Sequence, residues 1–229
     1  MSIKDSLKII QDRIEKVKNL NGINQKTEII AVTKTHPFLT IDECYSCGVR
    51  SIGENKVQEA AEKFTTPLPI DLKKRFIGHL QTNKVNKCID LFDTIDSVDT
   101  VRLAKKISKR SNQLERPTPV LLEINTTNEP QKKGFSLKQT EEILKCFELT
   151  GLVVQGLMTI GPKGRNEKLI RKSFSQLKNL FIEINRQRPD GYKKLTELSM
   201  GMSGDYEIAV QEGSTQVRIG TALFGKRIK

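Results

Sequence analysis

Aromatic residues and cysteines are scarce in this chain of 229 residues, which contains no tryptophan, three tyrosines, two histidines and four cysteines. No apolar run approaches the length that crosses a membrane, so a membrane-spanning helix is not expected. No Pro/Gly/Ser-rich linker and no low-complexity tract is present, so we expect one globular domain over residues 1–229. The amino terminus lacks the basic, apolar and small-residue order of a signal peptide, which predicts a cytoplasmic protein.

The four cysteines, Cys44, Cys47, Cys88 and Cys146, are expected to be free thiols because no secretion signal is present. Cys44 and Cys47 form a single C-x-x-C motif. A zinc ribbon needs a second such pair, and a redox motif needs a thioredoxin-like context. The pair falls on a predicted helix, so packing is favoured over metal or redox chemistry, and no metal site is expected.

The formal net charge is +12 and the isoelectric point is near 9.5. This charge permits contact with nucleic acid and also suits an anionic ligand. The basic residues form short separate clusters, such as Lys73-Lys74-Arg75, Lys105-Lys106 and Lys193-Lys194, which are expected to be mostly solvated. Because the chain has no tryptophan and no basic-aromatic motif, nucleic-acid binding is the least favoured functional interpretation of the net charge.

Short strand patterns alternate with longer helical patterns, after an opening amphipathic helix over Ile3–Leu20. The expected strands are Glu28–Lys34, Val49–Gly53, Arg75–Gly78, Leu91–Ser97, Val120–Asn125, Leu152–Thr159, Lys194–Ser199 and Gln216–Gly220. The expected helices are Ile41–Cys47, Lys56–Phe64, Leu80–Cys88, Val101–Ser111, Leu137–Leu149, Lys168–Asn185 and Asp205–Gln211. Eight such βα units predict an α/β fold, a closed single-domain (β/α)8 barrel of the TIM type. An open α/β sheet is the alternative, but no strand is followed by the G-x-G-x-x-G motif of a dinucleotide-binding unit.

Active sites of such barrels lie at the carboxyl ends of the strands, which draws attention to Lys34. Ile30, Val32 and Lys34 share one face of the first strand, so Lys34 ends an otherwise apolar face. Partial desolvation and a nearby cation favour the neutral, nucleophilic amine that forms Schiff bases. A surface lysine at a strand end is the simpler alternative.

Two strand ends near the carboxyl terminus each carry a glycine and a hydroxyl group, a pattern typical of phosphate binding. Barrel enzymes often hold phosphate at the loops after strands seven and eight. Asp205 and a nearby glutamate would repel an anion at the seventh loop, so the Gly220–Thr221 turn is favoured as the main holder. Ser199 and Ser203 would be supporting donors, although Ser203 could equally cap the following helix.

Arg218 shares a strand face with Gln216 and Gly220, and the alternation predicts that it points into the barrel mouth, facing Lys34. An inward arginine needs an acceptor. It could pair with a buried carboxylate such as Glu197 or Glu123, or with the ring nitrogen of a pyridine cofactor.

Six segments, in order along essentially the whole chain, resemble one family. They are A-V-T-K at Ala31–Lys34, G-E-N at Gly53–Asn55, F-I-G-H-L-Q-T-N-K at Phe76–Lys84, G-L-M-T-I at Gly156–Ile160, L-S-M-G-M-S at Leu198–Ser203, and E-G-S-T-Q-V-R-I-G-T-A-L-F-G at Glu212–Gly225. Together they resemble the pyridoxal phosphate homeostasis (YggS/PROSC) family. The resemblance implies a monomeric barrel like the N-terminal domain of alanine racemase, with pyridoxal 5′-phosphate (PLP) as its cofactor.

Carried over by position, the resemblance implies that Lys34 forms the Schiff base and that Asn55 lines the cofactor site. It implies that Ser199, Gly220 and Thr221 hold the phosphate. It also implies that an arginine, Arg218, faces the pyridine nitrogen.

The remaining candidates are weaker. Met200 and Ser203 would belong to the same wall of the cofactor site. His79 and Met158 lie at neighbouring strand ends, where structural roles are equally open. Lys132 matches a loop lysine that takes up PLP secondarily in the family.

The chain also departs from the family pattern. Arg75 stands where a histidine often precedes F-I-G-H-L-Q, and Lys133 is adjacent to Lys132, which leaves the loop assignment open. The tail Gly225–Lys229 is short, so a role given to a longer basic tail is not expected here.

An arginine beside the pyridine nitrogen cannot accept a proton and would keep that nitrogen unprotonated, which weakens PLP as an electron sink. Racemisation also needs an acid or base on each face of the substrate carbon. Lys34 serves one face, and no second domain is left to supply the other. We therefore expect a PLP-binding protein of vitamin B6 homeostasis without turnover, serving PLP-requiring apoenzymes. A PLP-dependent racemase or lyase is the first alternative, and a basic nucleic-acid-binding protein is the second.

Overall fold

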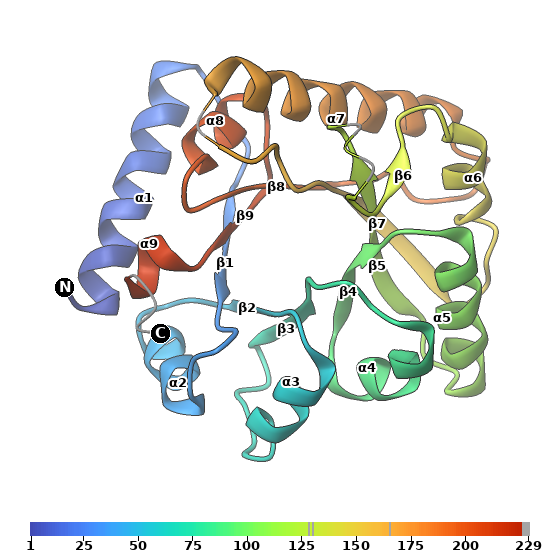
Figure 1. The fold of residues 1–229 in the computed structure, drawn as a ribbon, viewed down its shortest axis with the longest axis horizontal. Helices are drawn as coiled ribbons and strands as arrows, with labels where there is room; N and C mark the ends of the chain where they lie inside the picture. The colour runs from blue at the N-terminus through green and yellow to red at the C-terminus, as the bar shows by residue number, and fades with distance from the viewer. Residues whose placement is uncertain (128, 130, 165, 226–229) are drawn as a thin grey trace.

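Eight parallel strands close into a barrel in the computed structural model, which describes residues 1–127, 129, 131–164 and 166–225 (Figure 1). The strand order is β4-β3-β2-β1-β9-β8-β7-β5, and β4 pairs with β5 to complete the circle. The barrel strands are β1 (Glu28–Val32), β2 (Ser51–Glu54), β3 (Lys73–Phe76), β4 (Thr94–Val98), β5 (Thr118–Asn125), β7 (Leu152–Met158), β8 (Glu197–Met202) and β9 (Gln216–Ile219). The predicted TIM-type barrel is confirmed, and residues 226–229 of the predicted short tail lie outside the described residues.

Helices surround the barrel on its outside, as Figure 1 shows. They are α1 (Ile3–Leu20), α2 (Phe38–Ser46), α3 (Val57–Lys63), α4 (Val85–Leu91), α5 (Val101–Gln113), α6 (Thr140–Lys145), α7 (Glu167–Gln187), α8 (Tyr206–Gln211) and α9 (Thr221–Phe224). Among the described residues, none of these helices is long and apolar enough to cross a bilayer.

The structure corrects the expected boundaries in the first half of the chain. The helix expected over Leu80–Cys88 is a 3-10 turn, η1 (Thr82–Lys84), followed by α4, and the strand expected from Leu91 begins only at Thr94. Leu91 ends α4, and Phe92 is buried in the core directly after it. A short apolar run is compatible with either a helix end or a strand, which is why the pattern failed here.

Two corrections concern the second half. The helix expected over Leu137–Leu149 is confined to α6, with turns around it. A two-residue strand, β6 (Phe135–Ser136), pairs with the end of β5 and was not expected. Because β6 forms part of a loop and lies outside the barrel order, it leaves the eight-stranded architecture unchanged.

Helix α1 illustrates how local sequence determines an element. Ser2 and Asp5 form a capping box, in which the Ser2 hydroxyl accepts from the backbone N–H of Asp5. Its buried residues recur at helical spacing and pack in a cluster that joins β1, β2 and β9 to α1, α2 and α8. A second, larger cluster packs the remaining strands against α3–α7. Cys44 is buried on α2, Cys47 follows the end of that helix, and all four cysteines are free thiols, as expected.

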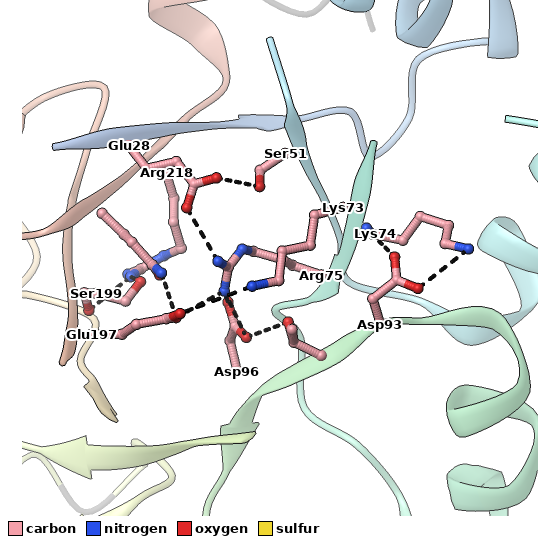
Figure 2. Close-up of polar contacts among 12 residues, drawn as sticks. Glu28, Ser51, Lys73, Lys74, Arg75, Asp93, Asp96, Glu197, Ser199 and Arg218 are labelled. Carbon is pink, nitrogen blue, oxygen red and sulfur yellow. Dashed lines mark hydrogen bonds and ion pairs between the residues drawn. The ribbon is translucent and has the colours of Figure 1, made fainter. Parts of the chain in front are cut away.

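An ion cluster around Arg75 of β3 joins side chains of β1, β4 and β8 inside the barrel (Figure 2). Arg75 is 1% exposed, and its guanidinium lies 3.1 Å from Glu28, 3.2 Å from Asp96 and 3.2 Å from Glu197. These carboxylates come from β1, β4 and β8, so one side chain joins strands on opposite sides of the barrel. Burial by itself lowers the pKa of Arg75, but the three carboxylates outweigh it and raise that pKa.

The expectation that the Lys73-Lys74-Arg75 cluster is solvated is wrong for Arg75. Strand alternation turns Arg75 into the barrel on the same face as Lys73, which lies nearer the amino end and has a side-chain exposure of 34%, whereas Lys74 is on the other face with 28%. The acceptors of Arg75 are supplied by distant strands, which no local charge count could reveal.

Candidate functional site

A cavity of about 320 Å³ lies at the carboxyl end of the barrel. It contains four of the predicted site residues, Lys34, Asn55, His79 and Lys132. The other lining residues are Ile77, Gly78, Glu123, Ile124, Asn125, Lys133 and Ile160. Side chains that follow β1, β2 and β3 therefore meet the β5 end and its loop at the end of the barrel where active sites are found.

Lys34 comes two residues after β1, and the predicted alternation is confirmed. Ile30 is fully buried and lies against Gly53 of β2, whereas Ala31 packs in the outer cluster against the helices. Lys34 continues the inward face and lines the cavity, half-buried. The structure therefore places Lys34 at the carboxyl rim of the barrel, after the apolar side chains of Ile30 and Val32 on the same strand face.

Asn55 is positioned by a close approach of two loops. Gly78, which follows β3, lies directly against Asn55, and a Cβ atom at Gly78 would stand 2.2 Å from the Asn55 carbonyl oxygen. His79 is the next residue, and its Nδ1 lies 3.1 Å from Asp99 Oδ2. Glycine at position 78 is therefore required for Asn55 and His79 to reach the same cavity.

Lys132 is held in a folded loop over the cavity. Its Nζ donates to the carbonyl of Gly161 at 2.9 Å and lies 2.7 Å from the Glu129 carboxylate. The Asn125 amide donates to the backbone carbonyl of Glu129 at 3.0 Å, which fastens the loop to the end of β5. Lys132 and the more exposed Lys133 both line the cavity, so the placement alone does not select one of them.

Ser203 joins the ends of β8 and β9. Its Oγ accepts from the backbone N–H of Gly220 at 3.2 Å and from that of Ala222 at 3.1 Å. The alternative in which Ser203 caps α8 is wrong, because Asp205 occupies the N-cap position. Two backbone donors therefore converge on one oxygen atom at the predicted phosphate turn, which is the arrangement that an oxyanion requires.

Arg218 lies deeper in the barrel than the sequence predicted. It pairs in register with Ile30, four residues before Lys34, and is 4% exposed. Its guanidinium donates to Ser199 O at 3.0 Å, to Ser199 Oγ at 2.9 Å and to Thr159 O at 2.8 Å. Burial lowers the pKa of Arg218, and nearby carboxylates oppose this. No ion pair joins it to Glu197 or Glu123 among the described residues, and its acceptors are Thr159, directly after β7, and Ser199, within β8.

Several predicted residues do not line the cavity that contains Lys34. Ser199 is fully buried and accepts from Arg218, and Met158 is 1% exposed. Met200 is fully buried in the larger hydrophobic cluster, and its carbonyl accepts from the Ser214 hydroxyl at 2.8 Å. Gly220 and the exposed Thr221 lie beside this cavity through the pairing of β9 with β1.

Glu123 is a site residue that sequence reasoning considered only as a partner of Arg218. It lies on β5, lines the cavity and is 8% exposed. Burial, together with the charge of Asp99, raises the pKa of Glu123 to about 7, and Arg218 opposes the shift. The available signal was a carboxylate in the otherwise apolar strand segment Val120–Ile124.

An eight-stranded parallel barrel with a lysine-lined cavity at its carboxyl end is a TIM-type barrel with a site where such barrels carry their chemistry, and comparison with known proteins gives its family. The family described as alanine racemase, N-terminal domain, matches residues 6–227. The chain belongs to this family and, within it, to the pyridoxal phosphate homeostasis proteins. It is similar to the pyridoxal phosphate homeostasis protein of Aquifex aeolicus, with 38% identity over 229 residues and 99% of each chain covered.

Two solved structures are similar in fold. The structure of PipY from Synechococcus elongatus with PLP bound matches with a TM-score of 0.85 and 34% identity, covering 98% of this chain and all of PipY. The alanine racemase of Clostridium difficile matches with a TM-score of 0.74 and 16% identity, covering 96% of this chain and 57% of the racemase. The second likeness concerns the fold alone, and this chain corresponds to about half of the racemase.

Proposed function

We propose that residues 1–229 form one PLP-binding domain that holds the cofactor as a Schiff base on Lys34 and acts in vitamin B6 homeostasis. The observation that carries the proposal is Lys34 itself, an inward amine in a cavity of about 320 Å³ at the carboxyl end of the barrel. The PLP-bound PipY structure, which shares this fold, supports it.

The residues present fit such a group. PLP supplies an aldehyde that condenses with an amine and a phosphate dianion that needs hydrogen-bond donors. Lys34 provides the amine, and Asn55 lines the same cavity. The N–H groups of Gly220 and Ala222 converge on Ser203 Oγ, and a phosphate oxygen would replace that hydroxyl oxygen as their acceptor, with Thr221 beside them.

The other predicted contacts have secondary roles in this proposal. Arg218 supports the phosphate region by holding the ends of β7 and β8 through Ser199 and Thr159. Met158 and Met200 support the wall from inside the protein, and Lys132 supports the loop that lines the cavity.

We propose that the protein acts without amino-acid turnover, in the cytoplasm and as a monomer, and that it serves PLP-requiring apoenzymes. The curated relatives are named as homeostasis proteins, which supports a role other than catalysis. Arg218 cannot accept a proton, and its donors already bind backbone carbonyls and Ser199.

One observation favours the alternative, a PLP-dependent racemase or lyase. Glu123 lines the Lys34 cavity, and with a pKa of about 7 it could carry a proton at neutral pH. Turnover of D- or L-alanine by the PLP-loaded protein that is lost in both Lys34→Ala and Glu123→Gln would establish this alternative.

The binding proposal is tested by adding PLP to the purified protein, reducing with borohydride and mapping the labelled peptide. We expect one trapped adduct on Lys34, and none in Lys34→Ala. The matched control is Lys133→Ala, which removes another lysine of the same cavity and should keep the adduct. Labelling spread over many surface lysines would show that the proposal is wrong.

A further inference from the structure

Two basic hollows follow one another outward from the Lys34 cavity, and the first adjoins it. The first, of about 210 Å³, shares Asn55 and His79 with that cavity. The second, of about 530 Å³, begins at Thr82 and Asn83 of the η1 turn, next to residues that line the first hollow. Six basic side chains line the two hollows, and we call them the basic track: Lys56, Lys84, Arg102, Lys105, Lys106 and Lys109.

The positive charge of the basic track is only weakly offset, through an electrostatic interaction of Lys56 with Glu59. No aspartate or glutamate lines either hollow. Within the part of the chain that the structure describes, none of the six side chains forms an ion pair or a hydrogen bond. Helix α5 contains no acidic residue, and of its basic residues Arg110 pairs with Asp90 at 3.3 Å.

The arrangement on α5 is unfavourable for the helix itself. Arg102 lies in the first turn, where the helix dipole favours anions and disfavours cations. Lys105, Lys106 and Lys109 follow at spacings of three and four residues, and like charges at those spacings repel. These four residues extend over about 10 Å along one side of the helix. An anion in the second hollow would relieve this repulsion.

We infer that the basic track is a docking surface for a phosphate monoester dianion and that it guides the phosphate of PLP toward Lys34. The inference rests on the proposed function for the identity of the anion. Clustered charge of one sign raises the local concentration of an oppositely charged ligand and can increase association rates by about 10- to 1000-fold. The shared lining residues Asn55 and His79 connect the basic track to the cavity.

The composition of the hollows argues against single-stranded nucleic acid as the occupant. Such ligands bind basic grooves through bases that stack on exposed aromatic side chains. No aromatic residue lines the second hollow. The first has only Phe76, which is 1% exposed, and His79, whose imidazole lies 3.1 Å from Asp99. The hollows therefore offer much charge and at most one exposed ring, which suits a small phosphate-bearing molecule better than a run of stacked bases.

The test measures the rates of PLP binding to and release from Lys34 by stopped-flow absorbance. The test variant carries Arg102→Gln, Lys105→Gln, Lys106→Gln and Lys109→Gln. The matched control carries Lys16→Gln, Lys145→Gln, Lys193→Gln and Lys194→Gln. The test variant and the control variant each lose four charges from exposed side chains. The control positions lie near the amino ends of the strands.

We expect the association rate constant of the test variant to fall about tenfold below that of the control at an ionic strength of about 0.01 M. The difference should disappear at about 1 M, where charges are screened beyond about 3 Å. The dissociation rate constant should stay within about twofold of the wild type, because the basic track lies outside the Lys34 cavity. Equal association rates in test and control variants at low salt would overturn the inference.

A separate titration with inorganic phosphate, followed through the NMR shifts of backbone amides, tests the basic track without the aldehyde. Shifts in α5 and η1 of the wild type that are absent from the test variant would support the docking surface. Identical shifts in both would overturn it. A wild-type protein that forms no trapped adduct on Lys34 would instead overturn the proposed function, so the two failures are distinguishable.

Discussion

Replacing the buried carboxyl group of Glu123 by an amide is predicted to change how stability depends on pH. Glu123 is 8% exposed, and its pKa is raised from 4.5 to about 7 by burial and by the charge of Asp99. A group with a raised pKa in the folded state favours folding while it is protonated in both states, below about pH 4.5. This contribution is lost as the pH rises through about 7.

The magnitude follows from the two pKa values. They differ by about 2.5 pH units, and each unit corresponds to 1.36 kcal/mol, so the wild type loses about 3 kcal/mol of unfolding free energy between pH 4 and pH 8 through this group. Glu123→Gln keeps the shape of the side chain and cannot ionise. The variant should therefore gain about 3 kcal/mol relative to the wild type over the same pH range.

The measurement is chemical denaturation at several pH values for the wild type and for Glu123→Gln. Taking the difference between the two proteins removes the contribution of titrating groups that do not interact with Glu123. The matched control is Glu148→Gln, which removes an exposed carboxylate and should follow the wild-type curve. If the stability difference between Glu123→Gln and the wild type were the same at pH 4 and pH 8, the account of this carboxyl group would be refuted.

Three further changes have defined outcomes. Arg75→Ala leaves the buried Asp96 and the partly exposed Glu28 and Glu197 without their cation, so the unfolding free energy should fall by about 3 kcal/mol, and an unchanged denaturation midpoint would contradict the ion cluster. Gly78→Ala places a Cβ atom 2.2 Å from the Asn55 carbonyl oxygen and should weaken equilibrium PLP binding about tenfold or more, whereas wild-type affinity would show that the loop contact is dispensable. Ser203→Ala removes the acceptor of the Gly220 N–H and should lower the unfolding free energy by about 1 kcal/mol. Added inorganic phosphate should restore this stability in thermal melts if the freed donors hold an oxyanion.

The periodicity of the sequence was sufficient to predict the barrel and the position of Lys34. Alternating strands and amphipathic helices are local patterns, and β1 turns Ile30 and Val32 inward because successive side chains of a strand point to opposite faces. The same alternation placed Lys34 at the cavity. The local pattern gave the wrong strand start at Leu91, because Leu91 ends helix α4 and Phe92 follows it as the C-cap residue.

The amino-acid sequence by itself therefore determined the eight βα units, the inward lysine and the glycine-containing turn at Gly220, because each depends on neighbours within a few residues. The tertiary structure alone decided which charged groups meet. Arg75 binds carboxylates from three distant strands, Arg218 binds backbone carbonyls in place of Glu197 or Glu123, and Glu123 faces the Lys34 cavity. The physical reason is that closing the barrel removes these groups from water, and each buried charge must then take whatever partner the opposite wall supplies.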